Sequence, residues 1–269
     1  MKKKKLYQIG LISISTCFVL ISFYLFITWY RENEETKNTE RYLQQLSEDA
    51  SVSNSSPQRI LVHPPEDEND SYWNYTKTPF LQIDFTSLLE ENKDTVGWIQ
   101  VMGTDIDYAV VQTSDNTYYL NHSFDHTKNS SGWIFSDFRN NLEHLNSNTV
   151  IYGHGRLDGS MFGTLKNTLD VAWYENKENH IIKLSTPKEN SIWQIVSVYT
   201  IPKESYYITT HFQEEEFQTF IDTIIDRSIY DFQTEVGTKH HILTLSTCQN
   251  NYGKRIVVHA KLIAKETQS

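Results

Sequence analysis

The chain has 269 residues, of which 34 are acidic, 24 are basic and 13% are aromatic. Four of the basic residues lie at positions 2–5, so the rest of the chain has 20 basic against 34 acidic residues, a formal charge of −14. An acidic surface repels phosphate backbones, and no basic stripe interleaved with aromatic residues is present, which argues against a nucleic-acid partner. The aromatic content excludes a largely disordered chain.

The N-terminus has the pattern of a membrane anchor. Four lysines at positions 2–5 precede an uncharged, mostly apolar run over residues 6–30, which is long enough to span a bilayer. Lysines before the run favour a cytoplasmic N-terminus, so we expect a single-pass protein of the cell membrane with everything after Arg31 outside. A cleaved signal peptide is the alternative, but the run exceeds the usual apolar length and no small-x-small cleavage site comes after it.

Residues 31–79 differ in composition from the remainder of the chain. Residues 32–50 are polar with sparse apolar positions, which predicts a short juxtamembrane helix, whereas the Ser, Pro and acidic residues of 51–79 predict a flexible spacer. We therefore expect an extracellular stalk that lifts a globular unit off the membrane. The predicted domain covers residues 80–264, and residues 265–269 are expected to be a C-terminal tail.

The predicted domain is rich in short strands. Asp84 is a candidate N-cap for a short helix that ends near Asp94, and helical segments are also expected at 116–120 and 160–169. One longer amphipathic helix is expected from Glu214 to about Ile229. Apolar runs rich in Ile and Val predict strands at 96–101, 106–112, 132–135, 149–152, 180–184, 192–200, 241–245 and 256–263. This pattern predicts a mainly β fold, a closed β-barrel of about eight strands.

Only one cysteine lies outside the apolar segment. Cys17 is inside that segment, whereas Cys248 ends a predicted strand, directly before the polar break 249–253. A lone thiol in an exported domain is either a reactive nucleophile or a buried side chain without a chemical role. Arg255 begins the next strand, and two adjacent antiparallel strands would bring it close to Cys248. A guanidinium there would favour the thiolate and bind an oxyanion, although it could also be an ordinary surface arginine.

Thiol chemistry also needs a proton carrier, which is usually histidine. Of the ten histidines, His154 comes after the apolar run 150–152 and lies between Gly153 and Gly155, where a strand delivers it into a turn. His259 shares a strand face with Arg255 and is the main rival. The residues alone leave both a functional and a structural role open for His154.

These motifs resemble the sortase family. The resemblance rests on Thr244-Leu-Ser-Thr-Cys248 followed by Arg255, with Tyr152-Gly-His154 upstream, and it extends over residues 80–264. The serine before the Thr-Cys pair and the helix before the cysteine strand are similar to class B members. One departure is the short connection of six residues between Cys248 and Arg255, where some class B enzymes have more. The resemblance implies no metal and no cofactor.

The resemblance also implies a mechanism, a groove and partners. Cys248 would attack the threonine carbonyl of an LPXTG- or NPQTN-like sorting signal, and His154 and Arg255 would assist. The acceptor would be the amine of a peptidoglycan precursor or a pilin, in a Gram-positive bacterium. A membrane-anchored cysteine peptidase that releases its product to water and a non-catalytic surface-binding module are the alternatives. The implied groove residues, of which Leu120 and Ile208 could equally be core, are Asn116, Leu120, Tyr152, Ile208 and Ser246.

Overall fold

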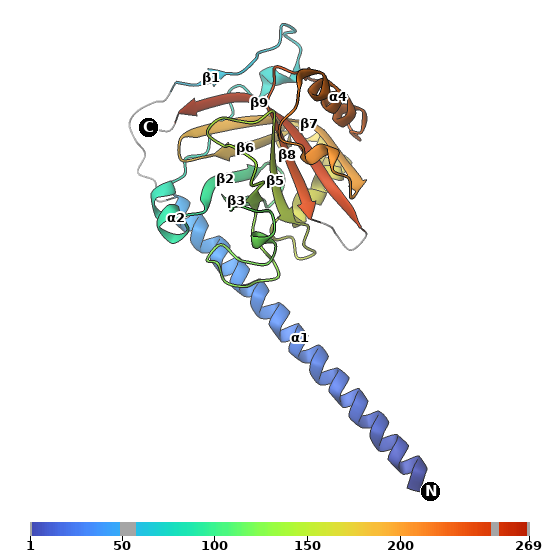
Figure 1. The fold of residues 1–269 in the computed structure, drawn as a ribbon. Helices are drawn as coiled ribbons and strands as arrows, with labels where there is room; N and C mark the ends of the chain where they lie inside the picture. Colours follow the sequence, from blue (N-terminus) through green and yellow to red (C-terminus); the bar gives the residue numbers. More distant parts are fainter. Residues whose placement is uncertain (1, 49–57, 249–252, 268–269) are drawn as a thin grey trace.

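A closed barrel forms the centre of the molecule (Figure 1). The computed structural model describes residues 2–48, 58–248 and 253–267. In this part of the chain the strands have the order β9-β7-β6-β2-β3-β4-β5-β8, and β8 pairs back to β9, which closes a barrel of eight strands with β1 added at the edge of β9. The strands are β1 (Ile60–Leu61), β2 (Thr95–Val101), β3 (Asp107–Val111), β4 (Phe135–Ser136), β5 (Asn148–His154), β6 (Ile181–Ser185), β7 (Glu189–Pro202), β8 (Ile242–Cys248) and β9 (Lys254–Thr267). The mainly β barrel predicted from the sequence is confirmed.

Two of the strands run further than the sequence predicted. β7 and β9 pair antiparallel from Glu189↔Thr267 to Pro202↔Lys254, and two register shifts interrupt the ladder. Lys265 in β9 also lies opposite Ile60 in β1. Residues 265–267 are therefore part of the sheet, whereas the sequence predicted a tail at 265–269. The apolar pattern missed these three residues because polar side chains occupy the end of β9.

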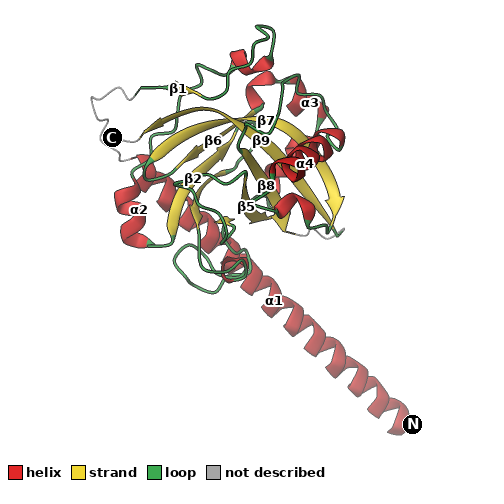
Figure 2. Cartoon of the chain, turned by 45° about the horizontal axis from the view of Figure 1, so that its top comes forward, coloured by secondary structure: helices red, strands yellow, loops and turns green. Residues whose placement is uncertain are grey.

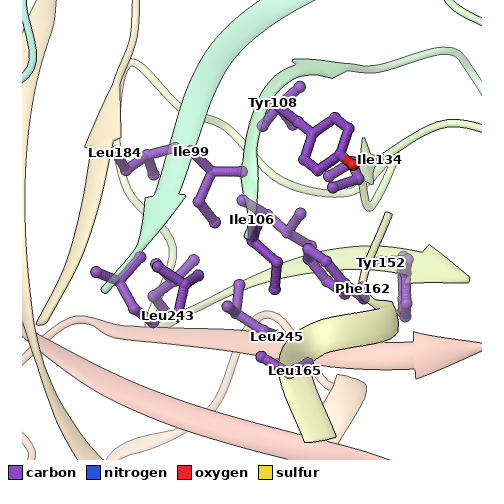
Figure 3. Close-up of a cluster of buried hydrophobic side chains, with 14 of the residues drawn as sticks. Ile99, Ile106, Tyr108, Ile134, Tyr152, Phe162, Leu165, Leu184, Leu243 and Leu245 are labelled. Atoms are coloured by element: carbon purple, nitrogen blue, oxygen red, sulfur yellow. The ribbon is translucent and has the colours of Figure 1, made fainter. Parts of the chain in front are cut away.

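The barrel interior is filled by aliphatic and aromatic side chains (Figure 3). Ile99 from β2, Leu184 from β6 and Leu243 and Leu245 from β8 have at most 1% of their surface exposed. Complete burial of such a side chain contributes about 1.5–3 kcal/mol relative to exposure. This packed interior fixes β8, and with it the strand end that carries Cys248.

The helices lie outside the barrel (Figure 2). The Asp84 side chain accepts a hydrogen bond from the Thr86 N–H at 2.8 Å and caps α2, as predicted. α4 buries Phe217, Phe220, Ile221 and Ile224 against β7, β8 and β9, which confirms the helix before the cysteine strand. The helices are α1 (Lys2–Glu48), α2 (Phe85–Glu91), α3 (Val171–Glu175) and α4 (Glu214–Asp226), with the 3-10 turns η1 (Ser71–Asn74), η2 (Tyr118–Leu120), η3 (Gly163–Leu169), η4 (Lys177–Asn179) and η5 (Tyr206–Ile208).

α1 is a single helix that joins the apolar segment to the barrel (Figures 1 and 2). Its apolar half is exposed and is long enough to cross a membrane. Its second half packs on the domain and buries Asn33, Thr36, Leu43 and Ser47 at helical spacing. The predicted juxtamembrane helix therefore exists, but it is not a free stalk. Sequence analysis missed this packing because most of the buried positions are polar.

Residues 58–79 also differ from the predicted spacer. β1 pairs with the end of β9, and Tyr72 is fully buried, with its hydroxyl donating to the carbonyl oxygen of Ile263 at 3.0 Å. The folded unit thus begins before residue 80, because this segment packs against the outer side of β9. The remaining positions of the predicted spacer, 51–57, lie outside the described residues.

Candidate active site

Three of the predicted site residues form a row at the adjoining ends of three neighbouring strands, β5, β8 and β9. In the parallel pair β5–β8, His154 lies opposite Cys248. In the antiparallel pair β8–β9 the pairing runs from Ile242↔Lys261 to Ser246↔Val257, which ends two residues before Cys248 on β8 and two residues from Arg255 on β9. Adjacent strands are about 4.8 Å apart and β8 lies between β5 and β9, so the strand end that carries Cys248 lies between the strands that carry His154 and Arg255. The side chain of Cys248 lies outside the described part of the structure.

Close packing around two glycines positions His154. Its Nε2 lies 2.7 Å from the carbonyl oxygen of Leu120. A carbonyl oxygen only accepts, so Nε2 is the donor of this hydrogen bond. A Cβ at Gly153 would lie 2.7 Å from the ring of Phe162. Gly132 has a φ of +60°, and a Cβ there would lie 3.0 Å from the His154 ring, so both positions require glycine.

Arg255 is anchored by a buried tyrosine. Its guanidinium NH1 donates to the hydroxyl of Tyr207 at 2.8 Å, and Tyr207 is completely buried. The same hydroxyl lies 3.2 Å from the Ser246 hydroxyl. Nε of Arg255 is buried and has no hydrogen-bond partner among the described residues. One edge of the guanidinium is thus fixed, while Nε remains a donor without a protein partner in this part of the chain.

A buried carboxylate connects several of the predicted groove residues. Asp137 accepts hydrogen bonds from Asn116 Nδ2 and from the Tyr152 hydroxyl, both at 2.9 Å. It also forms an ion pair with Arg139 at 2.7 Å, and Arg139 donates to the carbonyl oxygen of Ile208. Burial alone would raise the pKa of Asp137, but the hydrogen bonds from Arg139 and Tyr152 outweigh it and hold the pKa below its usual value. The carboxylate therefore stays charged and orients its neighbours.

The groove residues differ in their accessibility. Asn116, Leu120 and Ile208 are partly exposed, whereas Tyr152 is 7% exposed and Ser246 is completely buried. Three further residues border the same region and were missed by the sequence analysis, namely Asp137, Arg139 and Tyr207. Asp137 and Arg139 could have been found from the sequence, because they form a pair of opposite charges shortly after the predicted strand 132–135. Tyr207 carried no such signal, because its neighbourhood depends on tertiary packing.

The rival histidine lies away from the row. His259 is completely buried four residues beyond Arg255 on β9, where it contacts the hydroxyls of Tyr199 and Thr244 at 2.8 Å each. Burial lowers its pKa to about 3, so the ring is neutral and its role is structural. Among residues 2–48, 58–248 and 253–267, no group of three His, Cys, Asp or Glu side chains could hold a metal ion.

Comparison with known proteins agrees with this geometry. The sortase domain model matches residues 99–263. Sortase B of Listeria monocytogenes is 38% identical over 178 residues, covering 65% of this chain and 72% of the relative. Sortase B of Staphylococcus aureus is 39% identical over 183 residues, covering 66% of this chain and 74% of the relative.

Solved structures give the same result. The crystal structure of sortase B from B. anthracis in complex with AAEK1 superposes with a TM-score of 0.70 at 32% identity, covering 87% of this chain and 99% of that one. A Staphylococcus aureus sortase B–substrate complex superposes with a TM-score of 0.62 at 39% identity, covering 66% and 84%. On the matched family domain, the sequence identity and the shared barrel, this chain belongs to the sortase family, and within it to class B.

Proposed function

We propose that this sortase cleaves a C-terminal sorting signal after threonine and transfers the acyl group that ends in threonine to an amine. Its proposed catalytic residues are Cys248, His154 and Arg255. The observation that supports the proposal is the order of β5, β8 and β9, in which His154 lies opposite Cys248 and the strand that carries Arg255 pairs with the other side of β8. This row combines a nucleophile, a proton carrier and an oxyanion donor at one end of the barrel.

The reaction has two halves. The Cys248 thiolate attacks the threonine carbonyl, the C–N bond breaks, and a thioester forms between the enzyme and the threonine. The protonated His154 gives its proton to the departing amine. In the second half the neutral ring takes a proton from the incoming amine, whose nitrogen attacks the thioester and releases the thiolate. Each half leaves the imidazole ready for the other, because it loses one proton and regains one.

Arg255 is proposed to stabilise the oxyanion in both halves. Tyr207 holds one edge of the guanidinium, and the buried Nε remains a candidate donor toward the reacting carbonyl. Asn116, Leu120, Tyr152, Ile208 and Ser246 are proposed to form the peptide groove. Asn116, Leu120 and Ile208 are partly exposed and could contact the peptide directly. Tyr152 and Ser246 are buried and could support these residues from beneath the groove surface. Solved sortase B structures with a substrate and with triglycine support a peptide donor and an amine acceptor.

The apolar half of α1 is proposed to anchor the enzyme in the cell membrane, with the basic N-terminus in the cytoplasm and the barrel outside. In this arrangement the partners are exported proteins with LPXTG- or NPQTN-like signals, and the acceptor is a peptidoglycan precursor or a pilin amine.

A ligation assay tests the proposal. The protein from residue 31 onward keeps the packed half of α1, and it is incubated with LPXTG- and NPQTN-like peptides and triglycine, with Cys248→Ala as the control. We expect one peptide to be cut after threonine and joined to triglycine by the wild-type protein alone. Release to water without ligation would favour the peptidase alternative. Intact peptides together with a Cys248 that resists alkylation would contradict a catalytic role.

A further inference from the structure

The barrel begins directly where the apolar segment of α1 ends. The uncharged run stops at Tyr30, and α1 continues as helix into Glu32 and Asn33, which already contact the domain. Three helical residues correspond to about 4.5 Å along the axis. The polar layer on each side of a bilayer is about 5–7 Å thick. If Tyr30 marks the edge of the hydrocarbon core, the first contacts between α1 and the domain lie within the headgroup layer.

These first contacts involve the loops around His154. Arg156, two residues after His154, donates a hydrogen bond to the Asn33 side chain. On the other side, Asn129 Nδ2 donates to the Thr36 hydroxyl at 3.1 Å, and Ser130 contacts the Glu32 side chain. Two separate loops, 126–131 and 155–160, are therefore held on the first turns of the packed half of α1. Figure 1 shows α1 leaving the barrel on the side toward which the arrowhead of β8 points.

One residue of these loops exposes an apolar side chain to solvent. Leu157, next to Arg156, is 83% exposed, more than any other large hydrophobic residue of the described chain, including those of the apolar segment. Single exposed apolar side chains are common on soluble proteins, but a leucine beside a helix that is proposed to span a membrane can enter the lipid interface. On α1, Trp29 and Tyr30 lie at the level where interfacial aromatic residues are common.

We propose that the active-site end of the barrel rests on the surface of the bilayer that α1 spans, with Leu157 in the headgroup layer. The inference rests on the proposed anchoring by α1 and goes beyond it, because a spanning helix alone would allow a domain held at any height. Charge does not explain the contact, because Arg31 forms an ion pair with Glu35 at 3.7 Å and Arg156 forms one with Asp158 at 3.1 Å. The attachment is therefore apolar, and the peptide groove opens beside the lipid surface.

Fluorescence from single labelled cysteines tests the proposal in the full-length protein, reconstituted in phosphatidylcholine nanodiscs. All proteins carry Cys248→Ser, so catalysis plays no part in the measurement. One protein carries the label at Leu157→Cys and a matched protein carries it at Ile229→Cys. Ile229 is an apolar residue that follows α4 and is 50% exposed. Both proteins also carry Cys17→Ser. A third label at the native Cys17 reports on the anchor. Each protein carries an environment-sensitive dye and is measured with nitroxide lipids labelled at the headgroup or deep in the acyl chain.

We expect headgroup nitroxides to quench the label at position 157 at least about twofold more than the label at position 229, with a blue-shifted emission at 157 alone. Equal, weak quenching at 157 and 229 with strong deep quenching at Cys17 would overturn the proposal while leaving the anchor intact. A Cys17 label without deep quenching would overturn both the anchor and the proposal. Neither outcome bears on the chemistry at Cys248, which the ligation assay tests separately.

Discussion

The hydrogen bond from Arg255 to Tyr207 predicts that a buried tyrosine hydroxyl supports catalysis. Tyr207→Phe removes this hydroxyl without changing the shape of the rest of the side chain, so Arg255 NH1 and the Ser246 hydroxyl lose the contacts at 2.8 and 3.2 Å. A hydrogen bond to a charged group contributes about 1.5–3 kcal/mol. If that energy holds Arg255 in position for the transition state, kcat/KM falls about tenfold to a hundredfold, because about 1.4 kcal/mol corresponds to a factor of ten.

The neighbouring tyrosine provides a matched control. Tyr206→Phe also removes a hydroxyl, which lies 2.7 Å from that of Tyr199, but this contact leads away from Arg255. The assay measures kcat and KM for peptide ligation to triglycine, together with the thermal midpoint of each variant. We expect Tyr207→Phe to lower mainly kcat and Tyr206→Phe to leave kcat within about twofold. Equal activity of Tyr207→Phe and the wild type, or equal losses in both variants, would refute the positioning role.

Burial and charge lead to three more predictions. Asp137→Asn removes the carboxylate that accepts hydrogen bonds from Asn116 and Tyr152, so KM for the peptide should rise and the free energy of unfolding should fall by about 1–3 kcal/mol. Peptide titration measures the first quantity and urea denaturation the second. An unchanged KM would contradict a role of Asp137 in the groove. Leu245→Ala leaves a cavity inside the barrel and should cost about 2–5 kcal/mol in the same denaturation, and a loss under about 1 kcal/mol would show that the barrel collapses around it. Burial lowers the pKa of His180 and His240 to about 4 and that of His259 to about 3, below the value near 6.5 expected in the unfolded chain. The unfolded chain therefore binds more protons, and the free energy of unfolding should fall as the pH decreases from about 6.5 to 4. Thermal midpoints measured across this pH range check the prediction, and His259→Gln should reduce the dependence of stability on pH.

Strand content and the position of the key motifs were predictable because they depend on local pattern. The Ile and Val runs predicted the barrel, and the position of Cys248 at a strand end before a polar break was correct. The pairing of His154 with Cys248 was not predictable from periodicity, because β5 and β8 are far apart in the sequence and meet in parallel. Only the family resemblance linked the two residues.

The errors have a common physical cause, which is burial of polar surface. Asn33 and Thr36 are polar, so the packed half of α1 resembled a solvated stalk. Residues 58–79 resembled a spacer because Ser, Pro and acidic residues surround the few aromatic ones, although Tyr72 is completely buried. Ser246, a predicted groove residue, is likewise polar and completely buried, beside Tyr207. Hydrogen bonds to distant partners make such burial possible, and these partners are invisible in a local pattern.

Strand β9 closes the barrel, because it pairs with β7 on one side and with β8 on the other. Arg255 lies near the start of this strand, across from the end of β8. In the proposed topology the barrel folds outside the membrane, so neither the barrel nor the row proposed for catalysis can form until β9 has been exported. Barrel closure and assembly of the proposed site are therefore a single event, because a chain that lacks β9 lacks both the closing strand and Arg255.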